Sequence, residues 1–353
     1  MHNRLHGCWH CSIYEVVSRR QPAIPATVAR ILNPGNQPMG RGTRVCRDKV
    51  KMKTLKVSWS GNSLVLFVIG LLILTLGCGG GSSVHNLIPS PNFPQFSQVI
   101  VVVEENHGYS EVIGNTSMPY LNSLATKYGL ATQYFADTHP SIGNYFMLTA
   151  GQLITEDDGF TGTVDSDNIV RELLAAGKTW KSYAESLPFV GSTDAGAFPY
   201  KKGHNPFAYL TEVVNDNTQK QNLVAMPQFN SDVAAGRLPS FSFVVPNELH
   251  NAHDGSLADA DAWLKQNIAP LIASPSFQSN GLLIITFDEA NFDDLNHGGG
   301  HVATLIISPK AKAGFQSKTF YQHQSTLRLV SQALGLPRFP GLASTAPEMG
   351  EFF

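Results

Sequence analysis

The chain contains short runs of nearly continuous apolar residues, separated by longer segments in which apolar residues recur at helical spacing. The runs are Val99–Val103, Phe241–Val245, Leu282–Phe287 and Thr304–Ile307. Runs this short, without alternating polar residues, are typical of interior strands with both faces buried. They predict the strands of a largely parallel sheet.

Helical spacing fills the stretches between these runs. Residues 168–187 and 259–272 have the pattern of amphipathic helices, and a further helix is expected from Ile142 to Ala150. Strands alternating with helices predict an α/β fold, a three-layer sandwich around the sheet. No internal repeat or domain boundary is evident after residue 98.

Three of the predicted strands run directly into polar residues. These are Glu104-Glu105-Asn106 after the first run, Pro246-Asn247-Glu248 with His250, His253 and Asp254 after the second, and Asp288-Glu289 after the third. In open α/β sheets, sites form beyond the carboxyl ends of the strands. We therefore interpret these side chains as one polar site rather than as three separate solvated loops.

Composition excludes several classes of protein. Of 353 residues, 42% are hydrophobic, and 20 Phe, 10 Tyr and 4 Trp are too many aromatic residues for a disordered chain. From Gly79 onward, 14 Lys and Arg stand against 25 Asp and Glu, a balance of −11. Such a charge is unsuited to binding nucleic acid, which requires cations to neutralise phosphates.

The N-terminal region predicts export. Lys53 and Lys56 precede an apolar run, Leu64–Leu76, and Cys78 follows, in the order of a bacterial secretory signal. The run is short of the ~20 residues that span a bilayer comfortably. We expect a cell-envelope lipoprotein processed at Cys78; the alternatives are an uncleaved membrane anchor and a periplasmic or secreted protein.

This reading divides the chain into four parts. We expect residues 1–51 to be a non-native upstream extension, with Met52 the true initiator, residues 52–78 to be the signal or anchor, and residues 79–97 to be a flexible tether. Residues 98–353 then form the functional domain. All four cysteines precede residue 79, so this domain has neither a disulfide nor a thiol nucleophile.

The polar site suggests metal-assisted chemistry. Converging carboxylates and imidazoles repel unless protons or a cation relieve them, and a divalent ion such as Zn, Mn, Mg or Ca suits these ligands. Ser141 stands at the start of the helix expected from Ile142, where a hydroxyl next to a metal can act as a nucleophile. The alternative is that Ser141 is only the N-cap of that helix.

Short motifs in a fixed order make the chain resemble a known family. They are Glu105-Asn106, Pro140-Ser141 with Asn144, Pro246-Asn247, and Asp288-Glu289 followed by His301-Val302. Together they resemble the phosphoesterase family of bacterial acid phosphatases and phospholipases C, in the alkaline-phosphatase-like superfamily. The resemblance covers roughly residues 98–345.

The resemblance implies specific roles for these residues. Glu105, Asn106, Asp288 and Glu289, with Ser141, would hold one metal ion, and Ser141 would be the nucleophile that is phosphorylated. Ser141, Asn144 and Gly151 also reproduce a spacing found in the related nucleotide pyrophosphatases. The remaining residues are assigned as catalytic (Asn144, His253, His301) or substrate-binding (His204, Asn247, His250, Asp254).

The chain also departs from the superfamily pattern. Members with two metals carry an Asp and a His four residues apart, and Asn247, His250, His253 and Asp254 do not reproduce that pair. A second metal is therefore not expected. Among the other histidines, His323 is expected to be structural and His297 to have no role in the site.

These observations predict an exported, metal-dependent phosphomonoesterase that is similar to acid phosphatases and acts through a phosphoserine. Two alternatives stay open. One is a phospholipase C-like phosphodiesterase on the same scaffold, whose substrate would be a lipid headgroup. The other is a surface-anchored lipoprotein that binds its ligand without turnover.

Overall fold

The computed structural model describes residues 93–353. The predicted extension, signal segment, Cys78 and most of the tether lie outside the described residues. Within the described part of the chain, no helix is long and apolar enough to cross a membrane.

The domain is built on one eight-stranded sheet in the order β4-β3-β5-β1-β6-β7-β2-β8. Strands β3, β4, β5, β1 and β6 run parallel, whereas β7 is antiparallel to both β6 and β2. The strand bounds are β1 Gln98–Glu104, β2 Gly129–Ala131, β3 Trp180–Ala184, β4 Leu223–Ala225, β5 Phe241–Val245, β6 Gly281–Phe287, β7 Thr304–Ile307 and β8 Gln316–Ser317.

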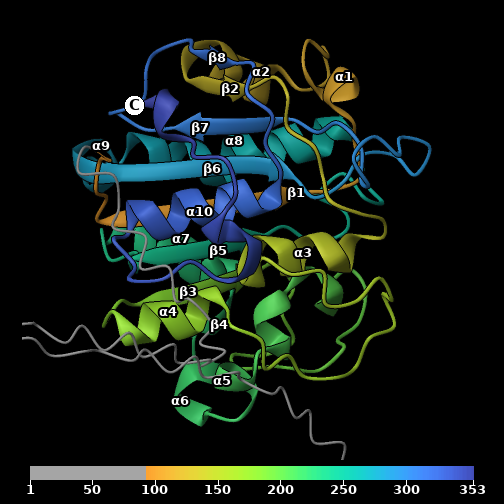
Figure 1. Cartoon of the computed structure of the whole chain (residues 1–353), viewed down its shortest axis with the longest axis vertical. Helices are drawn as coiled ribbons and strands as arrows, with labels where there is room; N and C mark the ends of the chain where they lie inside the picture. Colours follow the sequence, from red (N-terminus) through yellow and green to blue (C-terminus); the bar gives the residue numbers. More distant parts are fainter. Residues whose placement is uncertain (1–92) are drawn as a thin grey trace, which may run out of the picture. The chain divides into compact units, whose positions relative to one another are not determined.

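The four predicted strands are confirmed as β1, β5, β6 and β7. Every residue of these strands is buried, as expected for a sheet covered on both faces. In register, Val99 of β1 lies beside Phe241 of β5 and Leu282 of β6. The three strands therefore end close together, at the right-hand edge of the sheet in Figure 1.

Helices cover both faces of the sheet, which gives the predicted three layers. In Figure 1, α10 lies in front of the sheet, with α7 and α8 behind it. The helix bounds are α1 Tyr109–Val112, α2 Pro119–Lys127, α3 Ser141–Ala150, α4 Ile169–Ala175, α5 Thr211–Val214, α6 Asn217–Lys220, α7 Met226–Ala234, α8 Leu257–Ala273, α9 Pro275–Asn280 and α10 His323–Ala333. The helix expected over residues 259–272 is α8, and the one expected from Ile142 is α3.

The single helix predicted over residues 168–187 is wrong. The structure divides this segment into α4 and β3, separated by Gly177 in the left-handed region (φ +64°). Trp180 and Tyr183 of β3 are buried in the core, where aromatic residues favour the strand. Tertiary burial therefore overrides the local helical spacing in the second half of the segment.

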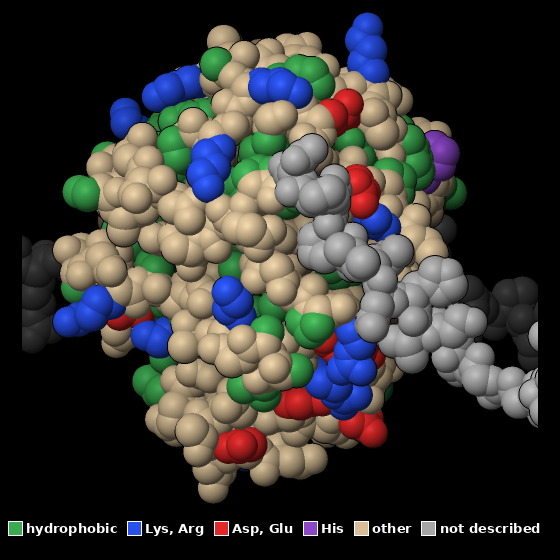
Figure 2. All heavy atoms as spheres, turned by 60° about the vertical axis from the view of Figure 1, so that its left-hand side comes forward, with side chains coloured by type: hydrophobic (Ala, Val, Ile, Leu, Met, Phe, Trp, Pro, Cys, Tyr) green, Lys and Arg blue, Asp and Glu red, His purple; other side chains and the backbone are tan. Residues whose placement is uncertain are grey.

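Charged groups are distributed unevenly over the domain. Figure 2 brings forward the side that lies on the left in Figure 1, opposite the edge where β1, β5 and β6 end. Lys and Arg side chains are spread over this face, and among the described residues histidines are visible only at its margin.

Candidate active site

Helix α3 brings Ser141 to the carboxyl edge of the sheet. Pro140 precedes the helix in an extended conformation, and Ser141 is its first residue. The Ser141 hydroxyl makes no capping bond; it donates to Oε2 of Glu105 (3.2 Å) and to Oε1 of Glu289 (3.4 Å). The alternative that Ser141 is only the N-cap is therefore wrong, because Pro140 occupies that position.

Glu105 follows β1 and is completely buried. Its Oε1 accepts a hydrogen bond from the Tyr145 hydroxyl and lies 3.2 Å from Nδ1 of His204. The rings of Tyr145 and His204 are stacked, with centroids 5.1 Å apart. One oxygen of Glu105 thus faces Ser141, and the other faces a phenol and an imidazole.

Asp288 and Glu289 follow β6 and are also completely buried. Oδ1 of Asp288 accepts the backbone N–H of Asn106 (3.1 Å), and Asn106 adopts a left-handed conformation (φ 55°), which asparagine tolerates. Glu289 lies 3.2 Å from Nδ1 of His139, the residue two positions before Ser141. The residues after β1, the residues after β6 and the segment leading into α3 therefore meet at Ser141.

The crowding of carboxylates shifts their titration. Burial, followed by the charge of Asp288, raises the pKa of Glu105 well above its usual value. Burial and the neighbouring Glu289 raise the pKa of Asp288 to about 7. The pKa of Glu289 is raised by burial, although His139 opposes the shift. Each shift reports the cost of placing ionised carboxylates together away from water.

The donor set around Ser141 fits a divalent cation. Oδ2 of Asp288 and Oδ1 of Asn106 are buried, and neither has a hydrogen-bond partner among the described residues. Unpartnered buried oxygens are costly unless another group satisfies them. Together with Glu105 and Glu289, they supply the oxygen ligands that hard cations prefer. The predicted ligand residues are therefore brought together with Ser141.

Asn144 lies next to Ser141 but is fully hydrogen-bonded. Its Oδ1 accepts the backbone N–H groups of Asp137 and Thr138, and its Nδ2 donates to the carbonyl of Thr138 and to Oε2 of Glu289. An amide has no further capacity beyond four such bonds. This arrangement favours a role in fixing Glu289 and the start of α3, rather than a contact with phosphate.

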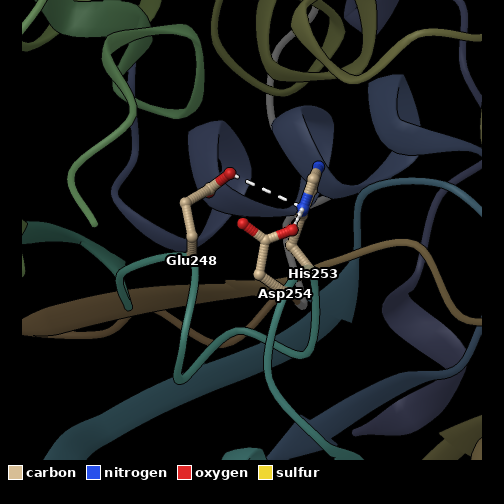
Figure 3. Close-up of side chains that lie close together, drawn as sticks. All are labelled: Glu248, His253 and Asp254. Carbon is tan, nitrogen blue, oxygen red and sulfur yellow. Dashed lines mark hydrogen bonds and ion pairs between the residues drawn. The ribbon is translucent and has the colours of Figure 1, made fainter. Parts of the chain in front are cut away.

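The polar residues of the loop after β5 form two groups with different neighbours. Glu248, His253 and Asp254 form a cluster in which one ligand atom from each lies within 4.8 Å of the others (Figure 3). Glu248 also reaches His204, with Oε1 2.9 Å from Nδ1. His204 contacts Glu105 directly, and Glu248 lies between His204 and His253, which pairs with Asp254.

Asn247 and His250 face a different neighbour. Both contact Glu185, which follows β3: the backbone N–H of Asn247 donates to its Oε2 (3.1 Å), and Nδ1 of His250 lies 3.0 Å from both oxygens. The Asn247 side chain bonds within the loops, to Ser186 and to the N–H of Leu249. The structure does not bring these two predicted substrate-binding residues to Ser141.

His301 is held away from the cluster by its own partners. Its ring is stacked between Tyr109 (4.5 Å) and Phe135 (4.8 Å), and its Nε2 lies 3.1 Å from the carbonyl of Thr132. Burial lowers the pKa of His301. The structure thus gives His301 a packing role in place of the catalytic role expected from sequence.

His297 and His323 both contact aromatic side chains. His297 packs against Phe135 and Phe320. His323 is buried between the carbonyl of Asp288 and the hydroxyl of Tyr134, so it is a structural histidine. Trp263 packs in the core.

Two residues of the site, Tyr145 and His139, were not singled out in the sequence analysis, and a third, Glu248, was placed in the polar site without a role. Tyr145 lies four positions after Ser141, on the same face of α3, and this spacing was a usable signal. His139 directly precedes Pro140-Ser141, so its proximity was also available from the sequence. Glu248 was visible as a strand-end carboxylate, but its pairing with His204 joins distant segments and has no local signal.

Comparisons with known proteins show the family of the chain. The model of the phosphoesterase family matches residues 115–337. A phosphatidylinositol-3-phosphatase of Mycobacterium tuberculosis is 33% identical over 291 residues, covering 82% of this chain and 93% of that protein. A probable acid phosphatase of Kluyveromyces lactis is 30% identical over 251 residues, covering 69% of this chain but only 59% of the relative.

Solved structures support the fold. A protein in the alkaline phosphatase superfamily from Vibrio parahaemolyticus aligns with a TM-score of 0.54 at 13% identity, over 75% of this chain and 74% of that one. The lipoteichoic acid synthase LtaP of Listeria monocytogenes aligns with a TM-score of 0.51 at 11% identity, over 69% and 72%. The chain belongs to the phosphoesterase family and is a hydrolase of phosphoric ester bonds with an alkaline-phosphatase-like fold.

Proposed function

We propose that this protein is a metal-dependent phosphomonoesterase that works through a phosphoserine on Ser141. The observation that carries the proposal is the position of the Ser141 hydroxyl at the start of α3, hydrogen-bonded to carboxylates from two strand ends. A hydroxyl buried among acceptors, at the positive end of a helix, is placed for attack on an anionic group.

The chemical step follows from this placement. The Ser141 Oγ–phosphorus bond forms while the bond from phosphorus to the alcohol oxygen breaks, in line with the attack. The hydroxyl proton passes to the adjoining carboxylates, and an imidazole, His204 or His253, protonates the departing alcohol. Water then hydrolyses the phosphoserine and releases phosphate.

The carboxylates serve this chemistry as metal ligands. Glu105, Asn106, Asp288 and Glu289 would hold the ion, and the unpartnered oxygens of Asn106 and Asp288 support that assignment. A divalent cation bound there would neutralise charge on the transferring phosphoryl oxygens and would lower the pKa of the Ser141 hydroxyl. We expect one such ion per chain.

A second candidate function is hydrolysis of a lipid phosphate. Loops after the strand ends expose large apolar side chains: Phe198 and Phe292 are each 63% exposed and Leu295 is 71% exposed. The Phe292 ring stacks on His139, which contacts Glu289, so apolar surface adjoins the site. This favours a leaving group with an apolar part, and the mycobacterial relative is named for a phosphoinositide substrate.

A substrate panel distinguishes these functions. We propose measuring hydrolysis of p-nitrophenyl phosphate, bis(p-nitrophenyl) phosphate, phosphatidylinositol 3-phosphate in mixed micelles and phosphatidylcholine, before and after chelation. Faster hydrolysis of monoesters than diesters, lost on chelation and restored by a divalent cation, supports the proposal. Preference for phosphatidylcholine or the bis-ester would favour a phosphodiesterase, and no turnover of any ester would favour a binding protein.

Export also stays a proposal. It depends on the basic, apolar and cysteine segments between Met52 and Cys78, in the order of a lipoprotein signal. Location at the cell envelope would allow the protein to act on phosphate esters outside the cytoplasm.

A further inference from the structure

We propose that Phe292 determines which phosphate esters the protein prefers, because its exposed ring packs on the alcohol part of the substrate. This role rests on the proposed function and specifies its substrate class: monoesters whose alcohol carries an aromatic ring next to the ester oxygen. Phe292 contacts the substrate but takes no part in the chemical step.

The Phe292 ring lies against the residues that surround Ser141. It stacks on the imidazole of His139, with the ring centroids 5.1 Å apart and the planes inclined by 30°. Nδ1 of His139 lies 3.2 Å from Oε2 of Glu289, and the other oxygen of Glu289 accepts the Ser141 hydroxyl at 3.4 Å. One imidazole and one carboxylate therefore connect Phe292 to the hydroxyl of Ser141.

His139 covers part of the Phe292 ring, and the rest of the side chain is open to solvent. Phe292 is 63% exposed, whereas the side chain of His139 is only 9% exposed. Leu295, in the same loop, is also largely exposed. Single apolar side chains are common on protein surfaces, but a group of them beside a polar site is typical of a surface that a ligand covers. The ligand at this place is the substrate of the Ser141 site.

The loop between β6 and β7 holds Phe292 in place. In Figure 1 this loop extends from the edge where β6 ends. On one side of Phe292, Nδ2 of Asn291 donates to Oε1 of Glu111 (2.7 Å). On the other side, the carbonyl of Asp294 lies 3.0 Å from Nε2 of His139. Because the loop is bonded on both sides, the ring is in position before a substrate arrives, which lowers the entropy cost of binding.

An exposed phenylalanine favours aromatic alcohols over polar ones. The ring has no hydrogen-bonding group, so a polar alcohol such as glycerol would lose water from its hydroxyls without gaining partners. An aromatic alcohol gains both from the removal of apolar surface from water and from the contact between two rings. The phosphate group stays next to Ser141, so Phe292 acts only on the part of the substrate that leaves.

Two other roles for Phe292 are the competing interpretations. If the ring only shields His139 from water, its removal would affect every substrate alike and lower the Tm. If the ring instead contacts a membrane, its removal would affect only lipid substrates presented in vesicles. The three roles therefore predict different patterns of activity across a set of substrates.

The test compares Phe292→Ala with wild type on phenyl phosphate, glycerol 2-phosphate and phosphatidylinositol 3-phosphate in phosphatidylcholine vesicles. For phenyl phosphate we expect KM to rise ~10-fold with little change in kcat, because ring packing is lost but no reacting group is removed. For glycerol 2-phosphate, kcat/KM should change by less than ~3-fold. Phe292→Tyr, which keeps the ring, should retain the wild-type preference for phenyl phosphate.

A matched control is Phe189→Ala, which removes a phenylalanine of similar exposure, 59%. Phe189 lies in the loop after β3, and the N–H of Gly191 bonds this loop to β4, which three strands separate from β6. The control should keep the wild-type preference. Equal losses on all three substrates in Phe292→Ala, or a loss confined to the vesicles, would overturn the proposed role of Phe292.

Phosphonate binding gives a readout that does not depend on turnover. Phenylphosphonate and ethylphosphonate contain no ester bond to cleave, and calorimetry gives the Kd of each. Wild type should bind phenylphosphonate more tightly than ethylphosphonate, and Phe292→Ala should reduce this preference ~10-fold. The same preference in the variant as in wild type would contradict the role of Phe292, even if wild type hydrolyses monoesters. Absence of ester hydrolysis, with the Phe292-dependent preference present, would count against the proposed function alone.

Discussion

The hydroxyl oxygen of Ser141 lies 3.2 Å from Oε2 of Glu105, although 36 positions separate the two residues in the chain. β1 delivers Glu105 to the edge of the sheet, and α3 begins at that edge with Ser141. Glu289, at the end of β6, completes the contact from the other side. Strand ends and a helix start thus concentrate negative charge around one hydroxyl, and the predictions below follow from that arrangement.

Asp288→Asn should lower activity but raise the stability of the metal-free protein. The variant keeps an oxygen for the N–H of Asn106 but removes a buried charge, so metal content and turnover should fall together. The metal-free protein should become more stable, because Asp288 no longer repels Glu289 and Glu105. Each kcal/mol gained corresponds to a rise in Tm of about 2–4 °C in a domain of this size. Full metal occupancy in the variant would show that the ion lies elsewhere.

Stability of the metal-free protein should decrease as the pH rises from about 4 to about 7. The folded-state pKa of Asp288 is raised from 3.8 to about 7, and those of Glu105 and Glu289 are raised as well. Between these values the folded chain retains protons that the unfolded chain releases, so raising the pH favours unfolding. Carboxylates whose pKa is lowered in the folded state, such as Glu248, change the stability mainly at pH values below this range.

Thermal melts across this pH range, with and without a divalent cation, test this dependence of stability on pH. The cation should stabilise increasingly as the pH rises, because it binds the ionised carboxylates. The difference in Tm between metal-free wild type and Asp288→Asn should be small near pH 4 and largest near pH 7. A metal-free Tm that rises throughout the range would contradict the carboxylate cluster as described.

Tyr145→Phe should weaken metal binding. The hydroxyl donates to Oε1 of Glu105, and its loss leaves a buried carboxylate oxygen short of a partner, while the stack on His204 is kept. Loss of an outer-shell bond of this kind costs about 10–100-fold in metal affinity. Titration of chelator-treated protein measures it. Tyr183→Phe, which removes a matching bond to Asp232 away from the site, should leave affinity unchanged.

His301→Ala should lower the stability of the protein and change its activity little. Its ring is fixed between Tyr109 and Phe135, so the variant loses packing but no group near Ser141. We expect kcat to change by less than ~3-fold, whereas His253→Ala should lower it by ~10²-fold, the usual contribution of a general acid. A large loss of kcat in His301→Ala with unaltered Tm would show that His301 has a catalytic role.

The central strands and their polar ends could be predicted because burial on both faces leaves a continuous apolar run. Four strands and the approach of Glu105, Asp288 and Glu289 follow from such runs, whereas Ser141 was proposed from its place before a helix and from the family resemblance. The split of residues 168–187 into α4 and β3 could not be predicted, because burial of Trp180 in the sheet is a tertiary effect.

Side-chain partners within the loops were harder to foresee. His250 and His253 are three residues apart, yet one pairs with Glu185 and the other with Glu248 and Asp254. His301 follows a glycine run and precedes β7, where the sequence suggests a site residue, but its ring stacks on Tyr109. Loop conformation, which no periodic pattern encodes, decides each of these contacts.

The most direct test of the account is to trap the covalent intermediate. Wild-type protein is mixed briefly with a phosphomonoester, quenched in acid and digested, and the peptide that contains Ser141 is analysed by mass. We predict a phosphate on Ser141 in wild type, its absence in Ser141→Ala, and a kcat in that variant lower by at least ~10³-fold with metal content retained. An Ser141→Ala variant with near wild-type kcat would contradict the account and leave direct attack by water as the mechanism.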